Sequence, residues 1–107
     1  MKTYEVQITQ EALQDLELIY DYIATKLFAP QAAEAIYNRL TGAILSLDCF
    51  PERCALLESQ SEFFKSIRRM VVGKYSVFYV IKGDVVIVTS ILYSASDIEK
   101  RLLARIR

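Results

Sequence analysis

The sequence predicts an α+β fold: an N-terminal strand, an antiparallel helical hairpin, a three-stranded antiparallel β-meander and a short C-terminal helix. Apolar residues recur at three- and four-residue spacing in the first half of the chain, and they alternate in the second half. Turn residues divide the second half into strands. The 107 residues, 53% hydrophobic and 24% charged, suffice for one hydrophobic core, so we expect a single domain over residues 1–107.

The first half of the chain is expected to form one strand and two helices. Alternation predicts a strand over residues 4–8, after which Thr9 is suited to be the N-cap of a helix that ends near Lys26. The predicted apolar side of this helix consists of Leu13, Leu16, Ile19, Tyr20, Ile23 and Leu27. Pro30 suits the first turn of a second helix. Its apolar residues are Ala33, Ile36, Leu40, Ala43, Ile44 and Leu47.

The link between these helices is only a few residues long, which favours antiparallel packing. Ala33, Gly42 and Ala43 are small enough to permit a close approach of the two helices. Gly42 inside a helix costs about 1 kcal/mol relative to alanine. This cost indicates either a packing requirement or a tolerated kink.

The second half is expected to form strands over residues 65–72, 75–81 and 85–93, after a loop. The turns are Gly73-Lys74, a good type II′ pair, and Lys82-Gly83-Asp84. A two-residue turn at Gly73-Lys74 places Val72 opposite Tyr75, Arg69 opposite Phe78 and Arg68 opposite Tyr79. Arg68 and Arg69 then point to opposite faces of the sheet.

Extending this parity through a second two-residue turn assigns most strand residues to a face, although a three-residue loop at either turn would reverse part of the assignment. One face carries Arg68, Met70, Val72, Tyr75, Val77, Tyr79, Val86, Val88, Ser90 and Leu92. The other carries Ile67, Arg69, Val71, Phe78, Val80, Ile87, Thr89 and Ile91. Both faces are largely apolar, so one should pack on the helical hairpin and the other needs a second cover.

The terminal helix and a partner protein are the two candidates for that cover. The segment "SDIEKRLLARIR" predicts a helix that begins with a capping box between Ser96 and Glu99. Ile98, Leu102 and Ile106 would form its apolar side.

The residue content excludes several kinds of chemistry. The chain has no histidine, so Ser-His-Asp and Cys-His catalysis and histidine metal sites are impossible. No phosphate-binding glycine loop occurs, and Cys49 and Cys54 are too few for a zinc site. We therefore expect no cofactor and no metal, and two reduced cysteines of which at least one is buried. The carboxylates of the first two helices are interpreted as solvated; they include Glu11, Asp15, Asp21 and Glu34.

Charge and hydropathy bear on location and partners. Lys plus Arg and Asp plus Glu both total 13, which weighs against binding of a long phosphate backbone, although Arg101, Arg105 and Arg107 cluster at the C-terminus. The N-terminus lacks the apolar core of a signal peptide, and no apolar run is long enough for a membrane span. A cytoplasmic protein is expected.

The face with Arg68 is the better candidate for partner binding. It combines an arginine with Tyr75 and Tyr79, whose side chains offer apolar area with a polar tip. In this interpretation Arg69 braces the sheet near a carboxylate. The alternative is that the tyrosines are half-buried sheet residues and both arginines pair with surface carboxylates.

Four segments in this order resemble the RelE/ParE superfamily of toxins from bacterial type II toxin–antitoxin systems. They are "ITQEALQDLELIYDYIA", "AAEAIYNRLTGAILSLDCFPE", "IRRMVVGKYSVFYVI" and "VVIVTSILYSASDI", which together cover nearly the whole chain. The resemblance implies a small growth-inhibiting cytosolic toxin, as in plasmid stabilisation systems, that a cognate antitoxin neutralises by wrapping around it. It leaves open a homodimer or a heterotetramer with the antitoxin.

Members of this superfamily have one of two activities. The resemblance implies that RelE-type relatives cut mRNA on the ribosome with basic residues and often a C-terminal His or Tyr, whereas ParE-type relatives inhibit DNA gyrase. Many relatives end the last strand with His and an arginine-rich step before Asp, but this chain has "YSASD" at residues 93–97, so Tyr93 replaces the His and the arginines are absent.

We favour the ParE-type interpretation, a gyrase inhibitor that is not an enzyme, with partner-binding residues Arg68, Tyr75, Tyr79 and Tyr93. The first alternative is a metal-independent, ribosome-dependent mRNA endonuclease that uses Arg68, Arg69 and Tyr93. The second is a degenerate toxin that binds its antitoxin but has lost activity.

Overall fold

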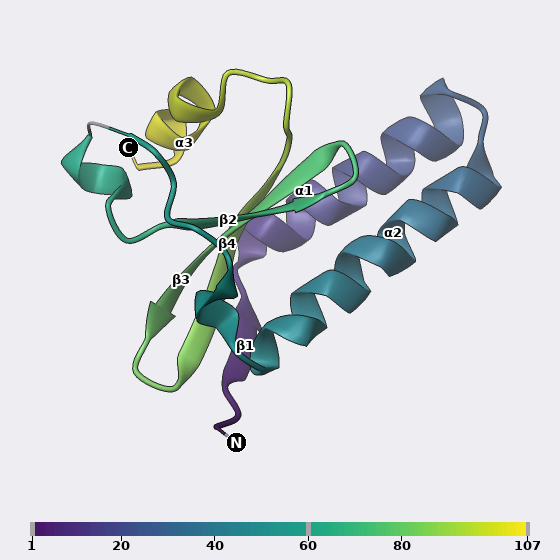
Figure 1. The fold of residues 1–107 in the computed structure, drawn as a ribbon. Coiled ribbons are helices and arrows are strands. Elements are labelled where there is room, and N and C mark those ends of the chain that lie inside the picture. Colours follow the sequence, from purple (N-terminus) through teal and green to yellow (C-terminus); the bar gives the residue numbers. More distant parts are fainter. Residues whose placement is uncertain (1, 60, 107) are drawn as a thin grey trace.

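The computed structural model describes residues 2–59 and 61–106, except the side chain of Ile106, so the predictions for that side chain and for Arg107 lie outside the described residues. A four-stranded sheet in the order β1-β4-β3-β2 forms the centre of this part of the chain, with the helical hairpin and the C-terminal helix packed on it (Figure 1). The strands and helices are β1 (Glu5–Ile8), α1 (Gln10–Asp21), α2 (Pro30–Leu45), β2 (Arg68–Val72), β3 (Tyr75–Lys82), β4 (Val85–Tyr93) and α3 (Ile98–Ile106). The predicted α+β order is confirmed.

The helical hairpin begins and turns at residues with clear local reasons. Thr9 caps α1, because its Oγ1 atom accepts a hydrogen bond of 3.2 Å from the Ala12 N–H. A five-residue π-helical segment, Tyr22–Lys26, extends α1, and the chain then reverses through Phe28, which has a positive φ of 52°. Pro30 occupies the first turn of α2. The predicted hairpin is therefore present, with a wider last turn in its first helix.

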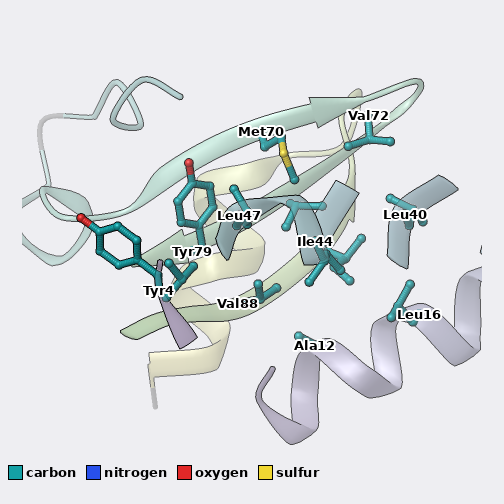
Figure 2. Packing of buried hydrophobic residues seen from close by; sticks show 13 residues of the cluster. Tyr4, Ala12, Leu16, Leu40, Ile44, Leu47, Met70, Val72, Tyr79 and Val88 are labelled. Carbon is teal, nitrogen blue, oxygen red and sulfur yellow. The ribbon is translucent and has the colours of Figure 1, made fainter. Parts of the chain in front are cut away.

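The main core lies between this hairpin and one face of the sheet (Figure 2). Its buried members are Tyr4, Ala12, Leu16, Leu40, Ile44, Leu47, Met70, Val72, Val77, Tyr79, Val86, Val88 and Ile91. Leu13 and Leu27 were predicted on the apolar side of the first helix, but 36% and 55% of their surface is exposed. Gly42 is exposed, and a Cβ atom added to it would have no neighbour within 4 Å, so packing does not require a glycine there.

The sheet joins one parallel pair to an antiparallel meander. β1 runs parallel to β4, and the helical hairpin connects it to the rest of the sheet. The predicted register of β2 and β3 is confirmed: Val72 lies opposite Tyr75, and Arg68 lies opposite Tyr79. Lys82 pairs with Val85, so the second turn also has two residues.

A β-bulge changes the predicted faces of β4. Phe78 pairs with Ser90 and Tyr79 pairs with Val88, which leaves Thr89 as an extra residue in β4. Because side chains alternate along a strand, this residue reverses the faces of those that follow it. Ile91 therefore joins the main core, and Leu92 packs on the opposite face, so the prediction for Ser90, Ile91 and Leu92 was wrong.

Part of the second face of the sheet is covered by α3 and the loop before β2, and the terminal helix was one of the two predicted covers. A smaller cluster buries Phe64, Phe78, Leu92 and Leu102, with Leu57, Ile67 and Ile98 at its edge. Leu102 and Ile98 come from α3. The cover is partial, since Val71, predicted for the same face, is 62% exposed.

The start of α3 differs from the predicted capping box. Asp97 caps the helix, since its Oδ1 atom accepts a hydrogen bond of 3.3 Å from the Lys100 N–H. Ser96 instead donates to the Tyr93 carbonyl oxygen at 2.5 Å, and Glu99 accepts a hydrogen bond from Ser59. The box between Ser96 and Glu99 was therefore wrong by one residue at the N-cap.

Two further expectations are corrected by burial. Asp15 is buried and paired with Arg105, not solvated, because α3 brings the arginine against α1. Both cysteines are free, but Cys49 is exposed and Cys54 is only half-buried at the edge of the core. Within residues 2–59 and 61–106, no helix has the length and apolar character needed to cross a bilayer.

Candidate functional site

Arg68 holds the loop that follows α2 against the sheet. Its Nη1 atom donates hydrogen bonds to the carbonyl oxygens of Cys54, at 2.7 Å, and Glu52, at 3.2 Å. The same loop pairs with the outer edge of β2, where the Arg69 N–H donates to the Ala55 carbonyl oxygen at 3.1 Å. The side chain is half-buried, and Nη1 is engaged by the backbone. Arg68 was predicted to bind a partner, but in the structure it fastens the loop after α2 to the sheet.

Tyr79 is fully buried beneath this loop. Its hydroxyl donates a hydrogen bond of 2.6 Å to the Pro51 carbonyl oxygen, and its ring lies among the core residues (Figure 2). Burial raises the pKa of Tyr79 above the ordinary phenol value. The prediction that Tyr79 offers a binding surface is corrected, because its ring is buried in the main core beneath the loop after α2.

Arg69 lies on the opposite face and braces the end of the hairpin. Its Nε atom donates to the Ser76 hydroxyl at 2.9 Å, and its guanidinium carbon lies 5.8 Å from the centre of the Phe78 ring. The Ser76 hydroxyl shares a hydrogen bond of 2.7 Å with that of Ser94. Arg69 was predicted to brace the sheet near a carboxylate. In the structure it bonds instead to a serine hydroxyl that is paired with a second one.

Tyr75 and Tyr93 form an aromatic pair where β3 and β4 lie side by side. They are cross-strand partners, and their ring centroids are 5.8 Å apart at an interplanar angle of 71°. Burial raises the pKa of Tyr75, and Tyr93 and Tyr22 contribute to the same shift. Tyr22, from the π-helical segment, therefore lies near this pair.

We call Tyr22, Tyr75 and Tyr93 the tyrosine patch. Tyr22 is 55% exposed and Tyr93 is 45% exposed, so much of the patch faces solvent. A cation lies at the neighbouring turn, because a Cβ atom added to Gly73 would lie 3.0 Å from an Nη1 atom of Arg39. Sequence reasoning missed Tyr22 and Arg39, since no spacing in the sequence indicates which residues of α1 and α2 approach the β2–β3 turn.

The three residues predicted for a nuclease do not converge. Arg69 points to one face, whereas Arg68 and Tyr93 belong to the other. On that face, Arg68 lies opposite Tyr79 and Tyr93 lies opposite Tyr75. Tyr75 and Tyr79 are four positions apart on β3, or about 13 Å at the usual rise of a strand. In this structure the three side chains therefore form no common cluster.

Comparison with known proteins defines the class to which this fold and these residues belong. Residues 6–98 match the family described as ParE toxin of type II toxin–antitoxin system, parDE. The match spans most of the 107 residues, so the chain belongs to this family and is the toxin of a type II toxin–antitoxin system. No match was found among curated proteins.

Solved structures share the fold. A chain of the chromosomal ParDE TA system from P. aeruginosa has a TM-score of 0.72 and 19% identity, covering 87% of this chain and 98% of that chain. One from the toxin–antitoxin complex RelBE2 of Mycobacterium tuberculosis has a TM-score of 0.61 and 20% identity, covering 90% and 97%. One from the archaeal RelE–RelB complex of Pyrococcus horikoshii OT3 has a TM-score of 0.60 and 18% identity, covering 87% and 97%.

Proposed function

We propose that this toxin acts in the cytoplasm by binding DNA gyrase and blocking it without cutting RNA, and that a cognate antitoxin neutralises it. The observation that carries the proposal is the separation of Arg68, Arg69 and Tyr93 over two faces of the sheet and about 13 Å of strand. The family match to ParE toxins supports the same choice.

The positions of Arg68, Arg69 and Tyr93 do not favour metal-independent RNA cleavage by these three residues. Such cleavage needs a base for the 2′-hydroxyl, a donor for the leaving group and cations for the charge on the phosphorane. Nη1 of Arg68 is occupied by backbone carbonyls, and Arg69 is held by Ser76 on the other face. A net charge of zero also provides little attraction to ribosomal RNA. A toxin that acts by protein contact needs none of these groups.

We propose the tyrosine patch as the surface that contacts gyrase. Tyr75 and Tyr93 remain proposed partner-binding residues, and Tyr22 is added to them. Arg68 and Tyr79 instead hold the loop after α2 on the sheet. Tyrosine is enriched among residues that dominate binding energy, because it buries a large rigid ring and keeps a polar tip. The neighbouring guanidinium of Arg39 adds a charge that suits an acidic partner surface.

The test compares two activities of the purified toxin, with a Tyr22→Ala/Tyr93→Ala variant beside the wild type. The first assay measures supercoiling by purified gyrase, and the second measures cleavage of a message translated on ribosomes. We expect loss of supercoiling with an intact message, and at least tenfold weaker inhibition by the variant. A cut message with normal supercoiling would overturn the proposal in favour of an endonuclease. The absence of both effects, with no growth defect, would identify an inactive toxin.

A further inference from the structure

The outer seam of the helical hairpin contains an open surface pocket of about 360 Å³. It is lined by Glu17, Tyr20 and Asp21 from α1 and by Tyr37 from α2. The two tyrosine rings meet edge to face, with centroids 6.0 Å apart and an interplanar angle of 85°. Glu17 and Asp21 are one helical turn apart, so their carboxylates flank the rings from the same side of α1.

Within residues 2–59 and 61–106, no cation is paired with these carboxylates. Among the described residues the ion pairs are Lys2 with Asp84, Lys65 with Glu62 and Arg105 with Asp15. The sequence of α1 contains no lysine or arginine, and residues 10–45 contain five carboxylates but only two cations. One of those cations, Arg39, lies at the β2–β3 turn. The seam is therefore a negative surface without a cationic partner among the residues that the structure describes.

The chemistry of the seam fits a cationic side chain. The face of a tyrosine ring attracts a guanidinium or ammonium group, by about 0.5–1 kcal/mol at exposed sites and about 2 kcal/mol when water is excluded. Two carboxylates beside the rings add charge-assisted hydrogen bonds to the same group. A neutral apolar side chain would leave the carboxylates without partners, and an anion would be repelled.

We propose that this seam binds an arginine or lysine side chain from a basic segment of the cognate antitoxin. The family requires an antitoxin, and the unmatched negative charge of the hairpin selects a basic segment of it by charge complementarity. The proposal rests on the antitoxin part of the proposed function and is independent of the gyrase part. It gives Glu17, Tyr20, Asp21 and Tyr37 a binding role beyond the packing of two helices.

The first test examines the seam without the antitoxin. Isotope-labelled toxin is titrated with N-acetyl-arginine amide and, as a matched neutral probe, with N-acetyl-citrulline amide, while backbone and tyrosine ring resonances are recorded. We expect saturable shifts at Tyr20 and Tyr37 with the arginine probe, and at least fivefold weaker binding to a Glu17→Gln/Asp21→Asn variant. Equal shifts with citrulline, or arginine shifts located elsewhere, would overturn the proposal.

The second test measures antitoxin affinity by calorimetry at two salt concentrations. We expect Glu17→Gln/Asp21→Asn to weaken binding about tenfold and to reduce its dependence on salt. Glu58→Gln, which neutralises an exposed carboxylate of the long loop before β2, is the matched control and should change nothing. Unchanged affinity and salt dependence in the double variant would overturn the proposal. Failure of the wild type to inhibit gyrase would overturn only the gyrase proposal, because this measurement does not involve gyrase.

Discussion

Tyr79 links the centre of the sheet to the loop after α2 through one buried hydrogen bond, from its hydroxyl to the Pro51 carbonyl oxygen at 2.6 Å. Tyr79→Phe keeps the ring but leaves that carbonyl without its donor. We expect the free energy of unfolding to fall by about 1–2 kcal/mol, the cost of a buried hydrogen bond and its unsatisfied partner. Urea unfolding at neutral pH measures the change. A loss below about 0.3 kcal/mol would contradict the bond.

The same residue makes stability depend on pH in the alkaline range. Burial raises the pKa of Tyr79 above the ordinary phenol value of about 10. Above about pH 10 the unfolded chain releases this proton while the folded chain retains it. The contribution of Tyr79 to the free energy of unfolding is therefore fully present below that pH and is lost as the pH rises above it. Tyr79→Phe should lower the slope of stability against pH between about pH 9 and 11. Tyr93→Phe, at an exposed position, is the control.

Asp15 and Arg105 tie the C-terminal helix to α1. The Asp15 carboxylate accepts hydrogen bonds of 2.6 and 2.9 Å from Arg105 and one of 2.9 Å from the Ile91 N–H. Asp15→Ala leaves the Arg105 guanidinium without its counter-charge and the buried Ile91 N–H without its acceptor. We therefore expect the free energy of unfolding to fall by about 2–4 kcal/mol. Asp15→Asn keeps an acceptor for Ile91 and should lose less. Urea unfolding of both variants tests this order, and equal losses would contradict it.

Among the elements, α2 contains a residue that the fold does not require. Gly42 lies in the exposed part of the helix, and a Cβ atom added there meets nothing within 4 Å. Gly42→Ala should therefore raise the free energy of unfolding by about 0.5–1 kcal/mol, since alanine loses less backbone entropy in a helix. Thermal and urea unfolding measure the gain. A loss of stability would contradict the open environment around Gly42.

The elements also show which features a sequence can predict. The Gly73-Lys74 turn determines the register of β2 and β3, because a two-residue loop permits only one pairing. The starts of the two helices follow from Thr9 and Pro30, because a cap and a first-turn proline affect only residues nearby in the sequence. The bulge at Thr89 was not predictable, since it depends on contacts with distant residues. Among them, Thr9 donates to the Thr89 carbonyl at 3.3 Å and Asp15 binds the Ile91 N–H.

At the scale of the whole molecule, acidic and basic residues are unevenly distributed although their charges balance. The helical hairpin carries an excess of carboxylates, and the C-terminal region carries basic residues, one of which neutralises Asp15. The sequence predicted Tyr75 and Tyr93 as partner-binding residues, but it did not predict that they form a pair, because without the bulge Tyr93 would lie on the opposite face. It did not predict Tyr22 beside them or the meeting of Tyr20 with Tyr37, because these contacts arise from the packing of separate elements. Such contacts define both proposed surfaces.

These two surfaces should be separable by mutation. Tyr20 and Tyr22 are two positions apart, or about 200° around a helix, so the seam and the tyrosine patch lie on different sides of α1. Tyr22→Ala/Tyr93→Ala should therefore weaken gyrase inhibition at least tenfold while antitoxin affinity changes less than threefold. Glu17→Gln/Asp21→Asn should give the reverse pattern. Both changes affect exposed side chains, so stability should stay within about 1 kcal/mol of the wild type. If both affinities fell together in either variant, one shared surface would have to bind both partners, and the antitoxin would act by covering the site that the target needs.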